Sequence, residues 1–366
     1  MIPQRVTMVC SSTTWGGTEK WALRAAEQLQ ARNIEVTFTG RSPELFARFA
    51  RFKMPFLQLP FVNEADIATV LRLAVHLRSQ DAVILTRVRD YWLGGLAARI
   101  AGTPSLLRLG VVRHLRNHYW MDRLRYGLLP SAVLVNARPI ANALQRTPWM
   151  RSLSISMISN GVDAPGAASA EEKAEARTAL SIPNNVLLII GTGRLAMEKR
   201  WPLLVHAVAE LKKRGLSVQG VLLGEGDQRG SLEQLIGELD VWDQITLPGH
   251  TTDIDRWLSA ADIFAQPSEN EGLSNSLLEA MGRGLACVST ATGGVRDHFS
   301  DGSELLIANA EDETGFIDRV VHLAEDPLLR AEVAGNGLQS VRQHFTWERM
   351  TDRLIEVLDN MTGGRK

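Results

Sequence analysis

The feature that most constrains the fold is a regular alternation of short apolar runs and helical patterns along the chain. The run RVTMVC (5–10) is followed by a helical pattern over 18–32 and by a second run, IEVTFTG (34–40). The same alternation starts again with the run VLLIIGT at 186–192. Strands that alternate with helices pair in parallel, so the sequence predicts an α/β protein with parallel sheets.

Length and linker composition predict two domains. A chain of 366 residues exceeds what a single core usually holds. The segment APGAASA (164–170) combines small residues and Pro without periodicity, which is typical of a linker. We therefore predict a Rossmann-like N-terminal domain over 1–165 and a second over 166–346. The amphipathic helical pattern over 347–366 could pack on either domain, including back on the first.

Composition disfavours several classes of protein. No stretch approaches the roughly 18 consecutive apolar residues of a membrane-spanning helix. The N-terminus reaches polar residues and Gly too early for a secretory signal. Cys10 and Cys287 are far apart in strand-like settings, so we expect neither a disulfide framework nor a metal cluster, and we predict a cytoplasmic protein.

The charge is distributed unevenly. Residues 1–165 hold 21 Lys and Arg against 10 Asp and Glu, whereas residues 166–366 hold 19 against 31. The first half is therefore expected to meet an anionic partner, the alternative being attraction between the two domains. The segment ELFARFARFK (44–53) is predicted to be a basic aromatic helix for an anionic membrane surface, the alternative being aromatic side chains in the core. Its candidate membrane residues are Phe46, Arg48, Phe49, Arg51, Phe52 and Lys53.

The first candidate site follows an apolar run in the second half. In GTGRLAMEK (191–199) the strand is expected to end near Gly193, and Arg194 and Lys199 project from the loop and the next turn. Two cations at a strand end suit a diphosphate. A tight turn with two solvated charges is the alternative.

A second candidate follows the first strand. In TTWGGTEKW (13–21), Gly16 and Gly17 would let backbone N–H groups approach an anion at the start of a helix. A phosphate could bind there, and a flexible strand-to-helix turn is the alternative.

The third candidate is SENEGLSNSLLEAMGRG (268–284), in which Glu271 and Glu279 lie eight positions apart. Ser274 or Asn275 is a plausible N-cap, and the N–H groups of the first helical turn attract phosphate. Carboxylates accept hydroxyl hydrogen bonds, so the two glutamates could hold sugars on either side of a phosphate pair. A nucleotide sugar has this layout, although spacing alone leaves two solvated carboxylates as the alternative.

These segments resemble a known family. ENEGLSNSLLEAMGRGLACVSTATGGVRD (269–297) is similar to the signature of the family 4 retaining glycosyltransferases. Their pattern is close to S-x-x-E-G-x-x-x-x-x-L-E-A-M-x-x-G-x-P-V. Further segments resemble the family and follow its order along the chain. They are TTWGGTEKW, MISNGVD (157–163), GTGRLAMEK and VLLGEGDQRGSLEQL (221–235).

The resemblance implies a GT-B fold, in which two Rossmann-like domains face each other across a cleft and the second binds a nucleotide-sugar donor. By position, Arg194 and Lys199 would hold the diphosphate, and no metal would be needed. Glu271 would hold the transferred sugar, and Glu279 the ribose hydroxyls. The remaining donor-binding candidates are Gly16, Gly17, Gly193, Gly249, His250, Gly272, Leu273, Ser274 and Asn275.

The predicted function is transfer of a sugar to a saccharide or a lipid-linked, anionic acceptor in cell-envelope polysaccharide or lipopolysaccharide assembly, at the inner face of the cytoplasmic membrane. Family members often carry a His after the strand SLLRLG, where this chain has Gly110, so Arg108 and His114 are the acceptor-side candidates. The alternatives are a nucleic-acid-binding module, which lacks a recognition motif, and an inactive glycosyltransferase-like subunit.

Overall fold

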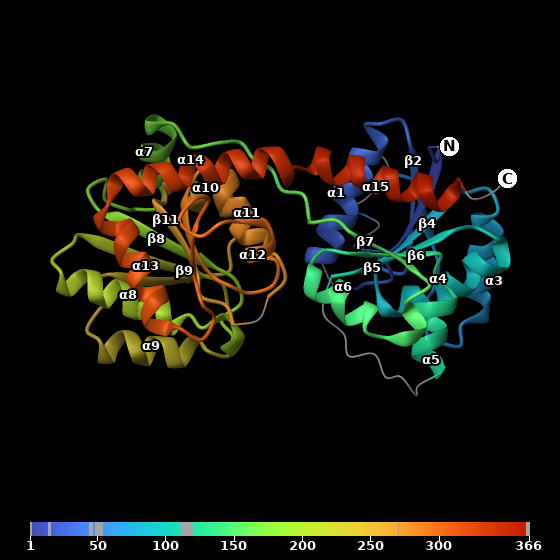
Figure 1. Ribbon diagram of the computed structural model, residues 1–366, viewed down its shortest axis with the longest axis horizontal. Helices are drawn as coiled ribbons and strands as arrows, with labels where there is room; N and C mark the ends of the chain where they lie inside the picture. Colours follow the sequence, from blue (N-terminus) through green and yellow to red (C-terminus); the bar gives the residue numbers. More distant parts are fainter. Residues whose placement is uncertain are drawn as a thin grey trace. The chain divides into compact units, whose positions relative to one another are not determined.

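The chain forms two compact units (Figure 1). This computed structural model describes residues 2–13, 16–43, 47, 54–110, 120–269 and 271–363. The first unit comprises Met1–Gly161 and Trp347–Lys366, and the second comprises Val162–Thr346. The division thus falls after Gly161, whereas the sequence predicted it after residue 165. Within the described ranges, no helix is both long and apolar enough to cross a membrane.

The first unit is built on a seven-stranded parallel sheet with the order β3-β2-β1-β4-β5-β6-β7. Two of its inner strands, β4 and β6, are apolar and buried throughout, which is typical of parallel strands whose two faces are both covered. The strands are β1 (Arg5–Val9), β2 (Glu35–Gly40), β3 (Phe56–Gln58), β4 (Ala82–Leu85), β5 (Ser105–Leu109), β6 (Ala132–Val135) and β7 (Ser154–Met157).

The C-terminal helix belongs to the first unit. Figure 1 shows α15 (Trp347–Thr362) beside α1 (Gly17–Gln30), and Met350, Leu354 and Leu358 are buried in the core that α1 shares. An ion pair of 2.8 Å joins Arg32 to Asp352 at the surface. The other described helices are α3 (Ile67–Leu77), α4 (Val88–Ala101), α5 (Trp120–Asp122), η1 (Arg123–Leu128), α6 (Arg138–Gln145) and η2 (Pro148–Met150).

The second unit has a six-stranded parallel sheet with the order β10-β9-β8-β11-β12-β13. The strands are β8 (Leu187–Thr192), β9 (Val218–Leu223), β10 (Ile245–Gly249), β11 (Ile263–Gln266), β12 (Ala286–Thr290) and β13 (Leu306–Ala308). The helices are α7 (Ala170–Ala179), η3 (Met197–Lys199), α8 (Pro202–Lys213), α9 (Arg229–Glu238), α10 (Ile254–Ala260), α11 (Asn275–Gly282), α12 (Val295–His298), α13 (Glu313–Glu325) and α14 (Pro327–His344). Two Rossmann-like units with parallel sheets confirm the predicted fold class.

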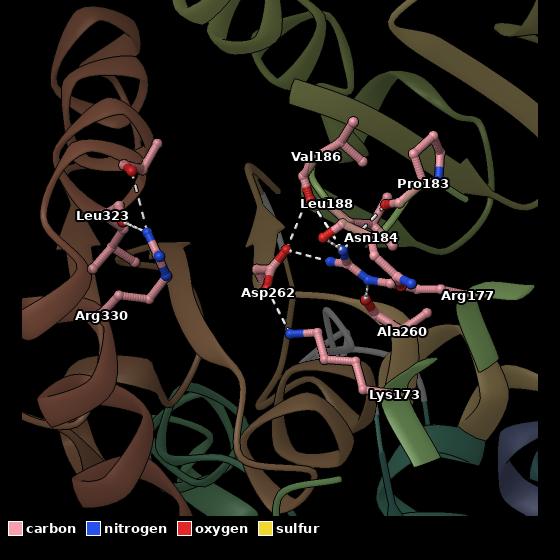
Figure 2. Close-up of polar contacts among 11 residues, drawn as sticks. Lys173, Arg177, Pro183, Asn184, Val186, Leu188, Ala260, Asp262, Leu323 and Arg330 are labelled. Carbon is pink, nitrogen blue, oxygen red and sulfur yellow. Dashed lines mark hydrogen bonds and ion pairs between the residues drawn. The ribbon is translucent and has the colours of Figure 1, made fainter. Parts of the chain in front are cut away.

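A buried polar cluster fixes the amino ends of β8 and β11 (Figure 2). Asp262, directly before β11, accepts hydrogen bonds from Lys173 Nζ at 2.6 Å, Arg177 Nη2 at 2.7 Å and the backbone N of Leu188 at 2.7 Å. Because Leu188 lies in β8 and the two cations lie on α7, one carboxylate ties α7 to both strands.

Arg177 completes this cluster from the helix side. Its side chain is only 5% exposed, and its Nε donates to the carbonyl of Ala260 at 2.9 Å. Its Nη1 donates to the carbonyls of Asn184 and Val186 at 3.0 and 3.1 Å (Figure 2). The guanidinium therefore satisfies backbone carbonyls that burial would otherwise leave without donors.

Each sheet has one position where the strand order reverses. In the first unit it lies between β1 and β4, and in the second between β8 and β11. In open α/β sheets, the loops at the carboxyl ends of the strands on either side of such a position form the ligand crevice. The segments after β8 and β11 contain the predicted Lys199 and Glu271.

Candidate active site

Lys199 and Glu271 meet at the carboxyl ends of β8 and β11. Lys199 ends the short helix η3, and its Nζ lies 2.8 Å from Oε1 and 2.7 Å from Oε2 of Glu271. The two side chains are 17% and 21% exposed. The structure thus joins directly two residues that were predicted separately for the diphosphate and the sugar.

The Glu271 carboxylate has a second partner, Ser268. This serine is fully buried just beyond β11, and its Oγ donates to Glu271 Oε2 at 2.9 Å. The carbonyl of Ser268 accepts a hydrogen bond of 2.5 Å from Thr290 Oγ1 at the end of β12. The backbone N of Glu269 donates to the carbonyl of Glu198 at 2.8 Å, so the loop after β11 is also joined to η3.

Gly293 holds the backbone of Glu271 from the other side. Its φ is +54°, and a Cβ at this position would lie 2.1 Å from the Glu271 carbonyl oxygen. A side chain would therefore clash with the loop as well as strain the backbone. The sequence reading assigned no role to Gly293, Ser268 or Thr290, although Thr290 and Gly293 lie inside the segment that resembles the family signature.

Arg194 differs from Lys199 in its exposure. Its side chain is 68% exposed, and its Nη2 lies 2.5 Å from Glu198 Oε1. The pKa of the Glu198 carboxyl lies below its ordinary value. The main cause is a hydrogen bond from the Glu198 backbone, and the Arg194 guanidinium lowers the pKa further. The backbone of Arg194 is fixed, because buried Trp201 donates from Nε1 to its carbonyl at 2.9 Å.

Gly193 and Gly224 lie in the loops beside the lysine. Gly193 has φ +150°, a conformation that a side chain would strain, although a Cβ there would make only an ordinary contact of 3.6 Å with Cε of Lys199. Gly224 (φ +151°) is required for a second reason, because a Cβ there would lie 1.9 Å from the Gly193 carbonyl oxygen. The two glycine loops are therefore tightly packed next to Lys199.

The start of α11 lies in the loop that carries Glu271. Leu273 is buried in the core, and Ser274 is the N-cap, with φ −71° and ψ 128°. The Ser274 side chain forms no cap hydrogen bond at this helix start. A Cβ on Gly272 would have open space around it. Asn275 and Glu279 lie on α11 itself and are half-buried.

Gly249 ends β10 and His250 follows it, at the same edge of the sheet. Gly249 has φ +88°, and its carbonyl accepts from the backbone N of Gly224 at 2.9 Å. This bond links the end of β10 to the loop after β9. His250 is exposed. These two donor-binding candidates are therefore at the carboxyl edge that also carries Lys199.

Gly16 and Gly17 lie in the first unit, where α1 begins after β1. Gly16 is the N-cap of α1, and a Cβ on it would lie 3.3 Å from Glu19 Oε2. The Glu19 side chain is completely buried and pairs with Arg87, whose Nη2 lies 2.5 Å from Oε1. This ion pair ties the start of α1 to the loop after β4.

Asp90 is a second buried carboxylate in the first unit. It accepts from the backbone N of Ser11 at 3.2 Å and from Thr86 Oγ1 at 3.3 Å. Burial raises the pKa of the Asp90 carboxyl to about 7. Burial, with Asp90 and Glu19 nearby, raises the pKa of the Cys10 thiol to about 12. These groups lie at the strand-order reversal between β1 and β4.

Arg108, one of the acceptor-side candidates, is buried in β5. Its guanidinium carbon lies 4.1 Å from the ring centroid of Trp21, and its Nη2 donates to Asn160 Oδ1 at 3.0 Å. Burial lowers its pKa to about 10. The arginine is therefore packed against protein groups rather than extended into solvent.

Several predicted residues lie outside the part of the chain that the structure describes. They are the acceptor-side candidate His114 and the membrane candidates Phe46, Arg48, Phe49, Arg51, Phe52 and Lys53. Among the residues that are described, no three His, Cys, Asp or Glu side chains are grouped so as to hold a metal ion. Asp253 caps α10 by accepting from the backbone N of Arg256 at 3.4 Å.

Solved structures match both units together. The structure of Anabaena Alr3699/HepE in complex with UDP has a TM-score of 0.85 at 18% identity, over 97% of this chain and 100% of that one. A glycosyltransferase from Rickettsia africae ESF-5 has a TM-score of 0.83 at 17% identity, with 98% of each chain covered. At such identities the likeness concerns the fold, which is that of the GT-B class.

Sequence comparisons match the chain to known glycosyltransferases. Residues 185–326 match the model described as glycosyl transferases group 1. The lipopolysaccharide core biosynthesis glycosyltransferase LpsE of Rhizobium meliloti (strain 1021) is 28% identical over 344 residues, covering 94% of this chain and 96% of LpsE. The 2-deoxystreptamine glucosyltransferase of Streptomyces kanamyceticus is 27% identical over 316 residues, covering 78% and 81%. The chain is therefore a glycosyltransferase, and the match to the group 1 model lies within its second unit.

Proposed function

We propose that this enzyme transfers a sugar from a nucleoside-diphosphate sugar to a saccharide or lipid-linked saccharide in the assembly of cell-envelope polysaccharide or lipopolysaccharide. The observation that carries the proposal is the pairing of Lys199 with Glu271 at the strand-order reversal between β8 and β11. The name of LpsE supports the pathway, and UDP in the HepE structure makes a UDP-sugar the first donor to test.

The donor's diphosphate would bind to Lys199 and Arg194. In the reaction, the bond between the anomeric carbon and the β-phosphate oxygen breaks, and a bond to the acceptor oxygen forms. Negative charge develops on the leaving nucleoside diphosphate, and the two cations with the first N–H groups of α11 would stabilise it. We therefore propose a metal-independent transfer.

The hydroxyl groups of the donor would be held by carboxylates. Glu271 and the backbone of Gly272, Leu273 and Ser274 would hold the transferred sugar, while Glu279 would accept from the ribose. Gly249 and His250 would lie beside the nucleobase, and Gly16 and Gly17 would approach the phosphates. Retention of anomeric configuration, a cytoplasmic location and peripheral membrane contact are parts of the proposal that rest on the family resemblance and the basic first half.

Thermal unfolding in the presence of a panel of nucleoside diphosphates and nucleotide sugars tests the donor class. A ligand that binds only the folded protein raises Tm by mass action, so at least one nucleotide sugar should raise it. Its hydrolysis or transfer should continue in EDTA if no metal is needed. The absence of any shift across the panel would contradict the proposal.

A further inference from the structure

The groups proposed for the diphosphate and for the sugar are hydrogen-bonded to each other. Both carboxylate oxygens of Glu271 lie within 2.8 Å of Lys199 Nζ. A diphosphate that binds to Lys199 must therefore replace Glu271 as the anionic partner of the lysine. Among the described residues, Ser268 also donates to the Glu271 carboxylate, but with one hydrogen bond, to Oε2. This bond alone offsets little of the negative charge when Lys199 is lost.

We propose that Glu271 competes with the diphosphate for Lys199, so that the site favours a nucleotide sugar over the nucleoside diphosphate product. This inference rests on the proposed function and concerns the same site. It assigns to Glu271 a role in discrimination and product release, in addition to holding the sugar.

The energetic reason is the fate of the displaced carboxylate. Glu271 is only 21% exposed, so losing its cation beside an incoming anion is costly. Hydroxyl groups of the transferred sugar can donate to the carboxylate and offset this cost. A nucleoside diphosphate brings no such donors, so its binding leaves Glu271 poorly compensated.

The loop that carries the carboxylate is held in place. Its backbone carbonyl is in close contact with Gly293, and the loop is joined to η3 through Glu269 and Glu198. Ser268, which holds Oε2, is itself held by Thr290. After transfer, the sugar hydroxyls leave with the product, and Glu271 can take Lys199 back and displace the nucleoside diphosphate.

The neighbouring pair of Arg194 and Glu198 provides an internal comparison. These side chains are 68% and 41% exposed, so water can solvate Glu198 when a phosphate takes Arg194. Glu198→Gln should therefore change diphosphate affinity much less than Glu271→Gln, although both remove a carboxylate next to a proposed phosphate ligand.

Calorimetric titration of UDP, inorganic pyrophosphate and UDP-glucose into the full chain tests the proposal. If the thermal panel selects another nucleotide, its diphosphate and sugar replace UDP and UDP-glucose. We expect Glu271→Gln to bind UDP and pyrophosphate about tenfold more tightly than the wild type, and UDP-glucose no more tightly. Glu271→Ala should show the same direction. Glu332→Gln, on the exposed surface of α14, is the matched control and should leave all three affinities unchanged.

The possible outcomes distinguish a failure of the proposed function from a failure of this inference. Wild-type protein that binds none of the nucleoside diphosphates or nucleotide sugars would overturn the proposed function and this inference with it. Wild-type binding together with equal or weaker UDP binding in both Glu271 variants would overturn the inference alone.

Discussion

Charged clusters lie at both ends of the strands β8 and β11, and the two clusters are bonded differently. At the amino ends, Asp262 accepts three hydrogen bonds, and Arg177 donates to carbonyls of the surrounding backbone (Figure 2). At the carboxyl ends, Lys199 and Glu271 bind chiefly each other and are partly exposed. A cluster whose partners are backbone groups stabilises the fold, whereas a pair of side chains can exchange partners with a ligand.

The first unit shows a third arrangement at its own strand-order reversal. Asp90 and Glu19 are fully buried there and are bonded to Ser11, Thr86 and Arg87. These carboxylates fix the loops after β1 and β4. The same topology therefore places charge at both reversals, but the carboxylates are fully buried in the first unit, whereas Glu271 in the second unit is partly exposed.

The largest expected effect is on transfer, from Lys199→Ala. Removing a cation that stabilises a leaving diphosphate should lower kcat/KM by about 10²- to 10³-fold. Initial rates with the donor selected by thermal shift measure this. Lys213→Ala, an exposed lysine at the end of α8, is the control and should keep the wild-type rate. A Lys199→Ala enzyme with wild-type kcat/KM would show that the pair is structural, like the cluster at the other end.

Arg177→Ala should act on stability, whereas Lys199→Ala acts on transfer. Arg177→Ala removes one of the three donors to Asp262 and the guanidinium that donates to the carbonyls of Asn184, Val186 and Ala260, so the free energy of unfolding of the second unit should fall by about 3 kcal/mol. Arg330→Ala removes only donors to the carbonyls of Leu323 and Ala324 and should cost about 1 kcal/mol. Urea denaturation measures both. An Arg177→Ala protein as stable as Arg330→Ala would contradict the structural role of the cluster.

The pH dependence of stability should distinguish the buried Asp90. Its pKa in the folded protein is about 7, above the ordinary value of 3.8, so the folded state holds the proton more tightly. Its contribution to stability is complete below the unfolded pKa and is lost as pH rises towards and through 7. Between pH 5 and 7.5, the loss of this contribution should lower the free energy of unfolding by about 2 kcal/mol. In Asp90→Asn, the free energy of unfolding measured by urea denaturation should fall less as the pH rises. An unchanged dependence on pH would refute the raised pKa of Asp90.

The smallest expected effect is that of Ser268→Ala. It removes one hydrogen bond to Glu271 Oε2 and leaves Lys199 in place, so kcat/KM should fall by about tenfold or less. Steady-state kinetics measure the change. Ser268→Thr retains the hydroxyl and tests whether that group, rather than the small volume, matters. A loss as large as that of Lys199→Ala would mean that Ser268 does more than position the carboxylate.

The parallel α/β architecture was predictable because strands buried on both faces appear as uninterrupted apolar runs. Lys199 and Glu271 were each found from local sequence. Their direct contact was not, because it depends on β8 lying beside β11, which the linear sequence does not state. Asp262 was missed for the same reason, since its partners come from α7 and β8. Arg108 was one of two acceptor-side candidates, and its burial against Trp21 depends on tertiary packing that the sequence does not state.

A crystal structure with the nucleoside diphosphate that gives the largest thermal shift tests the central claim most directly. The account predicts a phosphate oxygen within hydrogen-bonding distance of Lys199 Nζ, with Glu271 no longer bonded to that nitrogen through both oxygens. A nucleotide bound away from the carboxyl ends of β8 and β11, with the pair of Lys199 and Glu271 intact, would contradict it.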